Sequence, residues 1–273
     1  MLDVQKHKLR RGLKIWRLIP IEVHDAFMNM AIDEAIFRAR IEGLAPNTVR
    51  FYRWLPSAVS VGRFQKVENE VYIENCRRCG VDIVRRISGG GTVYHDSEGE
   101  ITYSVIADKE SLGTQDVAVI YRKICGGLIE ALKILSLNAD FSPGSERQCP
   151  NIVVKGRKIS GSAQAHSGNV VLQHGTLLVD VDLNRMFTLL KVPWAKSVAD
   201  VVCVAQDKIT SLRHELGAAP KIEEVYSALK AGFKKALGIE ISEDTLTDYE
   251  ISLSKKLRDE KYSSDRWNFE GKI

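Results

Sequence analysis

No apolar run in the sequence approaches the roughly 18 residues of a membrane-spanning helix. The basic N-terminal segment MLDVQKHKLRRGLK is not followed by the apolar stretch of a secretory signal. Internal repeats, low-complexity segments and linkers rich in proline, glycine and serine are also missing from the 273 residues. These absences exclude a membrane-spanning protein and a secreted one. They predict a cytoplasmic protein with a single domain over residues 1–273.

The sequence also lacks a strong excess of charge of one sign. It has 39 lysine and arginine residues against 35 aspartate and glutamate residues, a net charge of +4. The two signs are interleaved, as in KLRDEK near the end. A nucleic-acid-binding surface would show stronger clustering, so we expect no nucleic-acid partner. With 44% hydrophobic and 27% charged residues, the composition is that of a globular protein rather than a disordered chain or a fibre.

Cysteine is scarce and unevenly spaced. An odd number of cysteines in a chain without a signal argues against a disulfide framework. The sequence has one CxxC, and a structural zinc site normally needs a second pair of ligands, which neither another CxxC nor an HxxxH supplies. We therefore expect no metal site built from protein side chains alone. The five cysteines are Cys76, Cys79, Cys125, Cys149 and Cys203.

The sequence does contain a mixture of helical and extended patterns. Apolar residues recur at helical spacing over residues 26–40, and they alternate with polar residues in RFYRWLPSAVSVGRF and EITYSVIAD. The patterns form no regular βαβ repeat, which favours an α+β fold over a doubly wound sheet. The chain is mainly helical in pattern from about residue 220. Further strands are expected in VDIVRRI, NIVVKGRKISGSAQ and VVLQHGTLLVDVD, and further helices within 116–137, in KIEEVYSALKAGFKKAL and in DYEISLSKKLRDEKY.

The densest local signal is RRISGGGTVYHD, from Arg85 to Asp96. Three glycines after a strand let the backbone approach a ligand and turn its N–H groups toward anionic oxygens. The segment fits neither GxGxxG nor GxxxxGK[ST], so it predicts no Rossmann or Walker phosphate loop. A plain glycine-rich hairpin is the alternative. The neighbouring arginines, with His95 and Asp96, favour a ligand site.

A second candidate lies in KGRKISGS, residues 155–162. If Ile159 points into the core, Lys158 and Ser160 share the opposite face of the strand. A lysine held near an ATP α-phosphate can offset the charge that develops when an acyl-adenylate forms. The alternative is a solvated turn, since KGRK is a common surface composition.

Two further side chains could take part in a site. His174 is followed by Gly175 in an apolar strand, where a histidine is more often a core residue than a catalyst, although the glycine would admit a ligand. Cys149 is a nucleophile only if a base or a positive field activates it. Arg147 and Lys158 are near it in the sequence. An unreactive thiol is the alternative.

The combination of motifs is more specific than its parts. MNMAIDEAIF, RFYRW, SVGRFQ, RRISGGGTVYHD, GRKISGSAQ, LQHGTLLVDVDL and KYSSDRWNF follow one another from about Trp16 to Phe269. Together they resemble the lipoate–protein ligase family, within the group that also holds biotin ligases and octanoyltransferases. The resemblance implies a mixed, largely antiparallel sheet flanked by helices, like the catalytic domain of class II aminoacyl-tRNA and biotin synthetases.

The resemblance also implies a reaction. In such ligases lipoic acid and MgATP give lipoyl-AMP, and the lipoyl group then passes to a lysine of an acceptor domain. Lys158 would contact the carboxylate and the α-phosphate, and Mg²⁺ would sit on the phosphates with few protein contacts. The residues implied for the lipoyl-adenylate pocket are Arg86, Gly89, Gly90, Gly91, Thr92, Tyr94, His95, Ser160, Gly161, Ala163, His174 and Gly175.

Other activities in this group stay open. An octanoyltransferase would take octanoate from an octanoyl-acyl-carrier protein, without ATP, and would use Cys149 as its nucleophile. The Cys149-Pro150-Asn151 context favours the ligase, and a biotin ligase or a non-catalytic scaffold fits the motifs less well. The chain ends at Ile273, soon after the last motif, whereas many ligases continue into an accessory domain. We therefore expect a lipoate–protein ligase that works with a separate small accessory protein.

Overall fold

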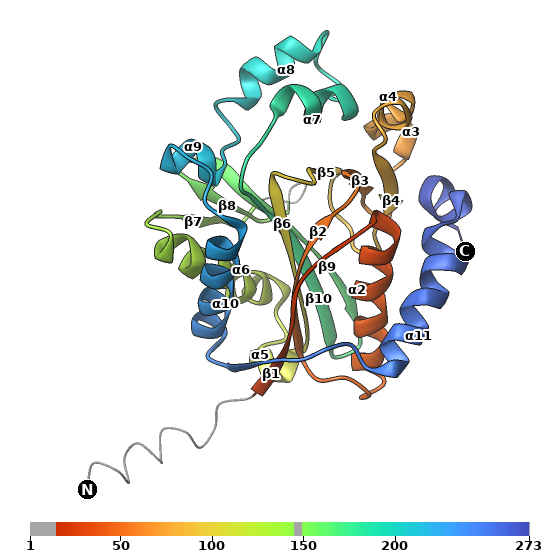
Figure 1. Cartoon of the computed structure of the whole chain (residues 1–273), viewed down its shortest axis with the longest axis vertical. Coiled ribbons are helices and arrows are strands. Elements are labelled where there is room, and N and C mark those ends of the chain that lie inside the picture. Colours follow the sequence, from red (N-terminus) through yellow and green to blue (C-terminus); the bar gives the residue numbers. More distant parts are fainter. Residues whose placement is uncertain (1–14, 145–148, 273) are drawn as a thin grey trace, which may run out of the picture.

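The computed structural model describes residues 15–144 and 149–272, which form an α+β structure (Figure 1). The main sheet has eight strands in the order β11-β1-β2-β6-β10-β9-β8-β7, and a smaller sheet has the order β4-β3-β5. The strands are β1 (Ile15–His24), β2 (Thr48–Trp54), β3 (Ala58–Val61), β4 (Asp82–Arg85), β5 (Val93–His95), β6 (Glu100–Asp108), β7 (Asp140–Ser142), β8 (Asn151–Val154), β9 (Arg157–Ser167), β10 (Val170–Leu178) and β11 (Glu240–Glu243).

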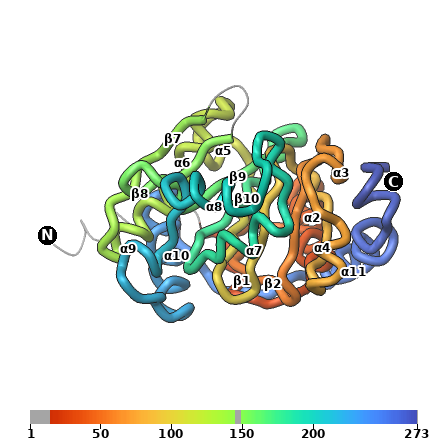
Figure 2. Tube along the Cα trace, turned by 90° about the horizontal axis from the view of Figure 1, so that it is seen from above, coloured from red at the N-terminus to blue at the C-terminus, as the bar shows by residue number. Residues whose placement is uncertain are grey.

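Helices cover both faces of the main sheet. Figure 2 shows α6 and α10 on one side of it and α2 and α11 on the other. The helices are α2 (Ala26–Ile41), α3 (Val67–Glu70), α4 (Ile73–Arg78), α5 (Lys109–Leu112), α6 (Val117–Ile134), α7 (Leu183–Leu189), α8 (Val198–Ala205), α9 (Leu212–Leu216), α10 (Ile222–Leu237), α11 (Asp248–Leu257) and the π-helical turns η1 (Arg258–Tyr262) and η2 (Arg266–Glu270).

The expected fold class is confirmed. In the main sheet β1 pairs in parallel with β2 and β11, and the other neighbours are antiparallel, so the sheet is mixed and largely antiparallel. The helix expected over 26–40 is α2. The helix expected through DYEISLSKKLRDEKY changes to π geometry after Leu257, and β1 and the separate small sheet were not predicted. Among the described residues, no helix is long and apolar enough to cross a membrane.

The alternation along β6 separates the core from the polar interior. Ile101, Tyr103 and Val105 enter the apolar core beneath α6 and α10. Because successive side chains of a strand point to opposite faces, Thr102 and Ser104 point toward α2 instead. The pattern EITYSV thus places a row of polar side chains on the face where the candidate site lies.

Glycines let α6 and α10 approach each other closely. A Cβ on Gly232 would lie 2.4 Å from the carbonyl oxygen of Gly127, so a larger residue there would push the two helices apart. The ring of Phe233 fills the space over Gly127 and is fully buried. The contact belongs to the core cluster that also supports β6 and β10.

We expect Gly127→Ala to destabilise the protein, because its Cβ would lie 2.6 Å from the Phe233 ring. Overpacking of this kind costs about 1–3 kcal/mol. The control is Gly126→Ala, whose Cβ would make an ordinary 3.4 Å contact with Ala236. Its better helix propensity should raise stability by up to about 1 kcal/mol. Urea unfolding measures both changes, and equal effects of the two variants would contradict this account of the helix contact.

Candidate active site

A cavity of about 650 Å³ opens between the glycine-rich segment and the strands β8, β9 and β10. Its inner wall is made of the buried side chains Met30, Tyr52 and Trp54. At its outer side lie exposed groups, Gly156 of the β8–β9 turn and Lys208. A cavity of this size, apolar with a few polar groups, is typical of a small-molecule site.

Arg86 fixes the shape of the glycine-rich segment. Its guanidinium is buried and makes five hydrogen bonds within the protein. Nη2 donates to the carbonyl oxygens of Gly89 and Gly91 at 3.0 and 2.9 Å, and Nη1 donates to the backbone and the hydroxyl of Ser60. Burial lowers the pKa of Arg86 to about 10, with the Cys149 sulfur opposing the shift. Arg86 is therefore a cation used mainly to hold the loop.

The preceding arginine has a different task. Arg85 Nε donates to the carbonyl of Trp267 at 3.0 Å, and its Nη1 donates to the carbonyls of Gly62 and Gln65. The Gln65 side chain in turn accepts hydrogen bonds from the Gly62 N–H and the Thr92 hydroxyl. Arg85 thus connects η2 to the turn that supports the glycine-rich segment.

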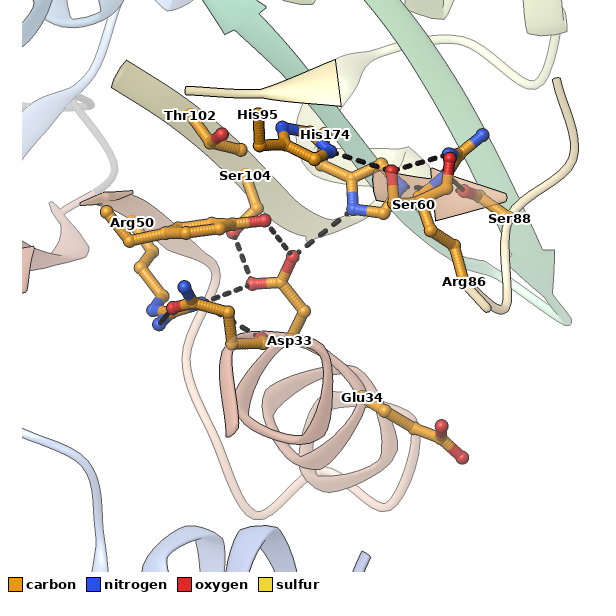
Figure 3. A network of polar contacts seen from close by, with 12 residues as sticks. Asp33, Glu34, Arg50, Ser60, Arg86, Ser88, His95, Thr102, Ser104 and His174 are labelled. Carbon is orange, nitrogen blue, oxygen red and sulfur yellow. Dashed lines mark hydrogen bonds and ion pairs between the residues drawn. The ribbon is translucent and has the colours of Figure 1, made fainter. Parts of the chain in front are cut away.

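Behind Arg86, a polar chain runs from β10 to α2 (Figure 3). His174 Nε2 lies 2.6 Å from the Ser88 hydroxyl, which accepts a hydrogen bond from Arg86 Nε. His174 Nδ1 lies 3.3 Å from Asp33 Oδ2. Burial lowers the pKa of His174; the hydrogen bond with Asp33 opposes this shift, and the positive charge of Arg86 adds to it.

Asp33 is the anionic end of this chain. It accepts hydrogen bonds from Arg50 Nη1, the Tyr52 hydroxyl and the Ser104 hydroxyl, each at 2.9 Å. Burial alone would raise the pKa of Asp33, but the hydrogen bond with His174 and the charge of Arg50 outweigh it and lower the pKa. A buried carboxylate with this many donors stays ionised at neutral pH.

A second chain leaves Ser60 toward β6. The Ser60 hydroxyl lies 2.7 Å from His95 Nε2, and His95 Nδ1 lies 2.7 Å from Glu100 Oε1. The His95 ring stacks on Trp54 with a centroid separation of 4.0 Å. These contacts turn the imidazole flat against the inner wall of the cavity. Both chains meet at Arg86, so the loop and the inner wall are held by one polar network.

Cys149 lies directly against the glycine-rich segment. A Cβ on Gly90 would be 3.2 Å from the Cys149 Sγ and 3.4 Å from the Ala163 Cβ. Gly90 also has a φ of +86°, which favours glycine. The sulfur therefore sits between the loop and β9, where a substrate in the cavity can reach it.

Cys149 is the only one of the five cysteines that lines the cavity. Cys76 and Cys125 are buried, and burial raises the pKa of both thiols, that of Cys76 to about 11. Cys79 and Cys203 are exposed and lie away from the cavity. Within residues 15–144 and 149–272 there is no group of three or more His, Cys, Asp or Glu side chains that could hold a metal ion.

Lys158 extends along the cavity wall toward Gly161. A Cβ on Gly161 would lie 2.8 Å from Lys158 Nζ, so a larger residue there would displace the end of the lysine side chain from this path. In the part of the chain that the structure describes, Nζ has no hydrogen-bond partner. The side chain keeps accessible surface because the cavity is open, yet the surrounding walls desolvate it and lower its pKa, while the Cys149 sulfur opposes the shift.

A β-bulge changes the expected spacing on β9. Ile152 of β8 pairs with Ser160, but the next residue, Val153, pairs with Lys158, so Ile159 is an extra residue on β9. As a result Ser160 is buried and does not line the cavity, and Gly161 takes that place beside Lys158. A strict two-residue period cannot show this shift.

The structure brings most of the expected site residues to one cavity. Gly89, Tyr94 and Ser160 are not on its wall, and the Tyr94 hydroxyl instead donates to Asp96. Arg147 lies outside the described residues. The expected residues on the wall are Arg86, Gly90, Gly91, Thr92, His95, Cys149, Lys158, Gly161, Ala163, His174 and Gly175.

Several residues near the cavity were missed. Asp33 and Glu100 orient the two histidines, and Trp54 and Lys208 line the wall. Asp33 lies within MNMAIDEAIF, a motif quoted for the family but assigned no role. An acidic residue on an otherwise apolar helical stripe is the signal that could have found it.

Residues 25–234 match the family model of the lipoyl protein ligase A/B catalytic domain. The chain belongs to this family. It is an enzyme of the lipoate and biotin ligase–transferase superfamily, and its family acts in the lipoylation of proteins. In structure it is similar to one component of a bi-partite lipoate protein ligase from Thermoplasma acidophilum (TM-score 0.81, 30% identity, 94% of this chain and 97% of that one). It is also similar to a lipoate-protein ligase A bound with ATP (TM-score 0.80, 31% identity, 94% and 99%).

The curated relatives of this chain are named for octanoyl transfer rather than for lipoate ligation. Octanoyltransferase LipM of Brevibacillus brevis is 35% identical over 93% of this chain and 98% of its own length. Octanoyltransferase LipM of Clostridioides difficile is 34% identical over 93% and 98%. The prediction of an ATP-dependent lipoate–protein ligase is therefore wrong. The Cys149-Pro150-Asn151 context, which favoured the ligase, does not identify one.

We expect the network around His174 to make stability depend on pH. The unfolded chain binds a proton at His174 below its ordinary pKa of 6.5, whereas the folded protein binds it only at lower pH. Stability is thus complete above pH 6.5 and falls as the pH drops below it. Urea unfolding over this range should show a smaller fall in His174→Gln, which keeps an amide beside Ser88. An identical fall in both proteins would contradict the depressed pKa.

Proposed function

We propose that this enzyme transfers an octanoyl group from an octanoyl-acyl-carrier protein to a lysine of a lipoyl-acceptor domain, with Cys149 as the nucleophile. The observation that carries the proposal is the position of the Cys149 sulfur in the cavity, against Gly90 and within electrostatic reach of Lys158. The names of the LipM relatives support the same activity.

The proposed reaction has two balanced steps. In the first, the Cys149 sulfur attacks the carbonyl carbon of the carrier thioester; an octanoyl–Cys149 thioester forms, and the carrier leaves as a thiol that takes up the proton of Cys149. In the second, the neutral amine of the acceptor lysine attacks this thioester. An amide forms, the lysine loses a proton, and Cys149 regains its thiol.

Both steps place negative charge on the thioester oxygen, and the loop can receive it. Arg86 occupies the carbonyls of Gly89 and Gly91. Among the described residues, the N–H groups of Gly90 and Gly91 have no acceptor; both glycines line the cavity, and Gly90 lies beside Cys149. Backbone N–H groups held in this way stabilise an oxyanion without reorganisation during the reaction.

Lys158 supplies the positive field that a cysteine nucleophile needs. Its ammonium lies over Gly161, with no carboxylate among the described residues to neutralise it. The Cys149 sulfur opposes the lowering of the Lys158 pKa by burial, so it favours the charged form of the lysine. The octanoyl chain would occupy the apolar inner part of the cavity beside Met30, Trp54 and Ala163.

This proposal changes the cofactors and partners. A carrier thioester is already activated, so the transfer needs neither ATP nor Mg²⁺. Octanoyl-carrier protein replaces lipoic acid as the acyl source, and the acceptor domain stays as expected. The separate accessory protein was expected for adenylate formation, and the transfer proposed here includes no such step.

Incubation with octanoyl-carrier protein, without ATP, should give a protein mass increased by one octanoyl group, located on Cys149 by peptide mass spectrometry. Cys149→Ala should show no adduct and no octanoylation of an acceptor domain, because no thioester can form. Transfer at an undiminished rate by a folded Cys149→Ala protein would overturn the proposal. So would an absolute requirement of the wild type for ATP.

Replacing Lys158 should slow the formation of the octanoyl–Cys149 thioester. Lys158→Met removes the ammonium and keeps the length of the side chain, so we expect the single-turnover rate to fall by about 10²–10³-fold. Lys158→Arg retains the charge and should recover part of the rate. The variants are compared by quenched-flow mass spectrometry, with circular dichroism as a check on folding. A folded Lys158→Met protein that is acylated at the normal rate would rule out this role.

A further inference from the structure

The wall of the cavity carries positive charge without a matching negative one. Three cationic side chains line it, those of Arg86, Lys158 and Lys208. Of the described residues on the wall, none is aspartate or glutamate. Such a lining attracts an anionic ligand, because uncompensated charges in a concave site raise the local concentration of ions of opposite sign.

The three cations are not equally free. Arg86 is occupied by carbonyl and hydroxyl groups of the loop. Lys158 extends over Gly161, where its charge interacts with the Cys149 sulfur. Lys208 is exposed, and its side chain has no hydrogen bond or ion pair with any part of the chain that the structure describes. It is therefore the cation still available to a substrate.

The backbone places Lys208 beside Lys158, at the outer side of the cavity. The Lys158 N–H donates to the Lys208 carbonyl at 2.8 Å, and Ile209 forms a bridge with Lys158. Along β9, Ala163 lies five positions after Lys158, and Ala163 lies beside Gly90 at the Cys149 sulfur. At the ordinary rise of a strand this is about 15 Å.

The chemistry of the donor determines which anion could lie there. A thioester and its octanoyl chain are neutral, so neither explains a cation this far from the sulfur. Acyl carriers hold their thioester on a pantetheine arm that ends in a phosphate. Two amide-linked units separate the sulfur from the phosphate, and in extended form this arm spans a distance of the required order.

We infer that Lys208 binds the phosphate of the phosphopantetheine arm while the thioester lies at Cys149. This inference rests on the proposed function and adds the group of the donor that the enzyme recognises. The same phosphate is present in octanoyl-carrier protein and in octanoyl-coenzyme A. A charge-assisted contact at an exposed lysine should contribute about tenfold in binding of the donor.

The test compares two small donors that differ only in this group, octanoyl-phosphopantetheine and octanoyl-pantetheine. We expect wild type to acylate Cys149 with both, with a KM about tenfold lower for the phosphorylated donor. Lys208→Met should raise the KM for octanoyl-phosphopantetheine about tenfold, with kcat little changed, and should leave octanoyl-pantetheine unaffected. Octanoyl-carrier protein and octanoyl-coenzyme A are tested in the same way. Of these two sources of the phosphate, the one whose KM rises in Lys208→Met is the one that Lys208 binds.

The matched control is Lys155→Met, in the β8–β9 turn. Lys155 forms an ion pair with Glu215 at 3.0 Å and does not line the cavity, so its removal should change neither KM. An equal effect of Lys208→Met on both donors, or no preference of wild type for the phosphate, would overturn the inference while Cys149 acylation still supports the proposed function. If neither donor nor carrier acylates Cys149, the proposed function itself fails.

Discussion

A buried guanidinium loses stability for each N–H group that lacks an acceptor, and at Arg86 all five of these groups are satisfied in a way that shapes the site. Most of the available acceptors are backbone carbonyls on either side of Gly90 and a serine on each flanking segment. With those carbonyls turned toward Arg86, the N–H groups of Gly90 and Gly91 have no acceptor among the described residues. His95 and His174 then hold the hydroxyls of Ser60 and Ser88 in place. The loop, the inner wall and the position of Cys149 depend on this one charge.

Local patterns were enough to predict much of the fold. The helical stripe of 26–40, the alternation in EITYSV and the helical pattern in KIEEVYSALKAGFKKAL each depend on residues close in sequence, and each appears in the structure. β1 was missed because its partners β2 and β11 are distant along the chain, and IWRLIPIEVH alone does not reveal a strand paired on both sides. The change to π geometry after Leu257 has no simple sequence pattern either.

The candidate site was predicted in part for a related reason. The glycine, arginine and lysine motifs identified much of the cavity wall, because close backbone approach requires glycine and positive charge requires arginine or lysine. The bulge at Ile159 and the role of Asp33 depend on how distant strands and a helix meet. The type of acyl donor was the hardest to predict. A glycine-rich loop and a lysine suit the charge of an adenylate and that of a thioester intermediate equally well, so these motifs do not distinguish the two donors.

Arg85 connects the last turns of the described chain to the candidate site, although these turns lie about 180 residues from the glycine-rich segment in the sequence. Its guanidinium joins the carbonyl of Trp267 to those of Gly62 and Gln65, and Arg63 reaches the carbonyl of Gly271. The turn at residues 62–65 in turn braces the glycine-rich segment through Gln65 and Thr92. Residues 266–271 thus support the glycine-rich segment through the turn at residues 62–65. Protein engineers who fuse a tag or a second enzyme at this end should therefore leave these turns and their arginine contacts intact.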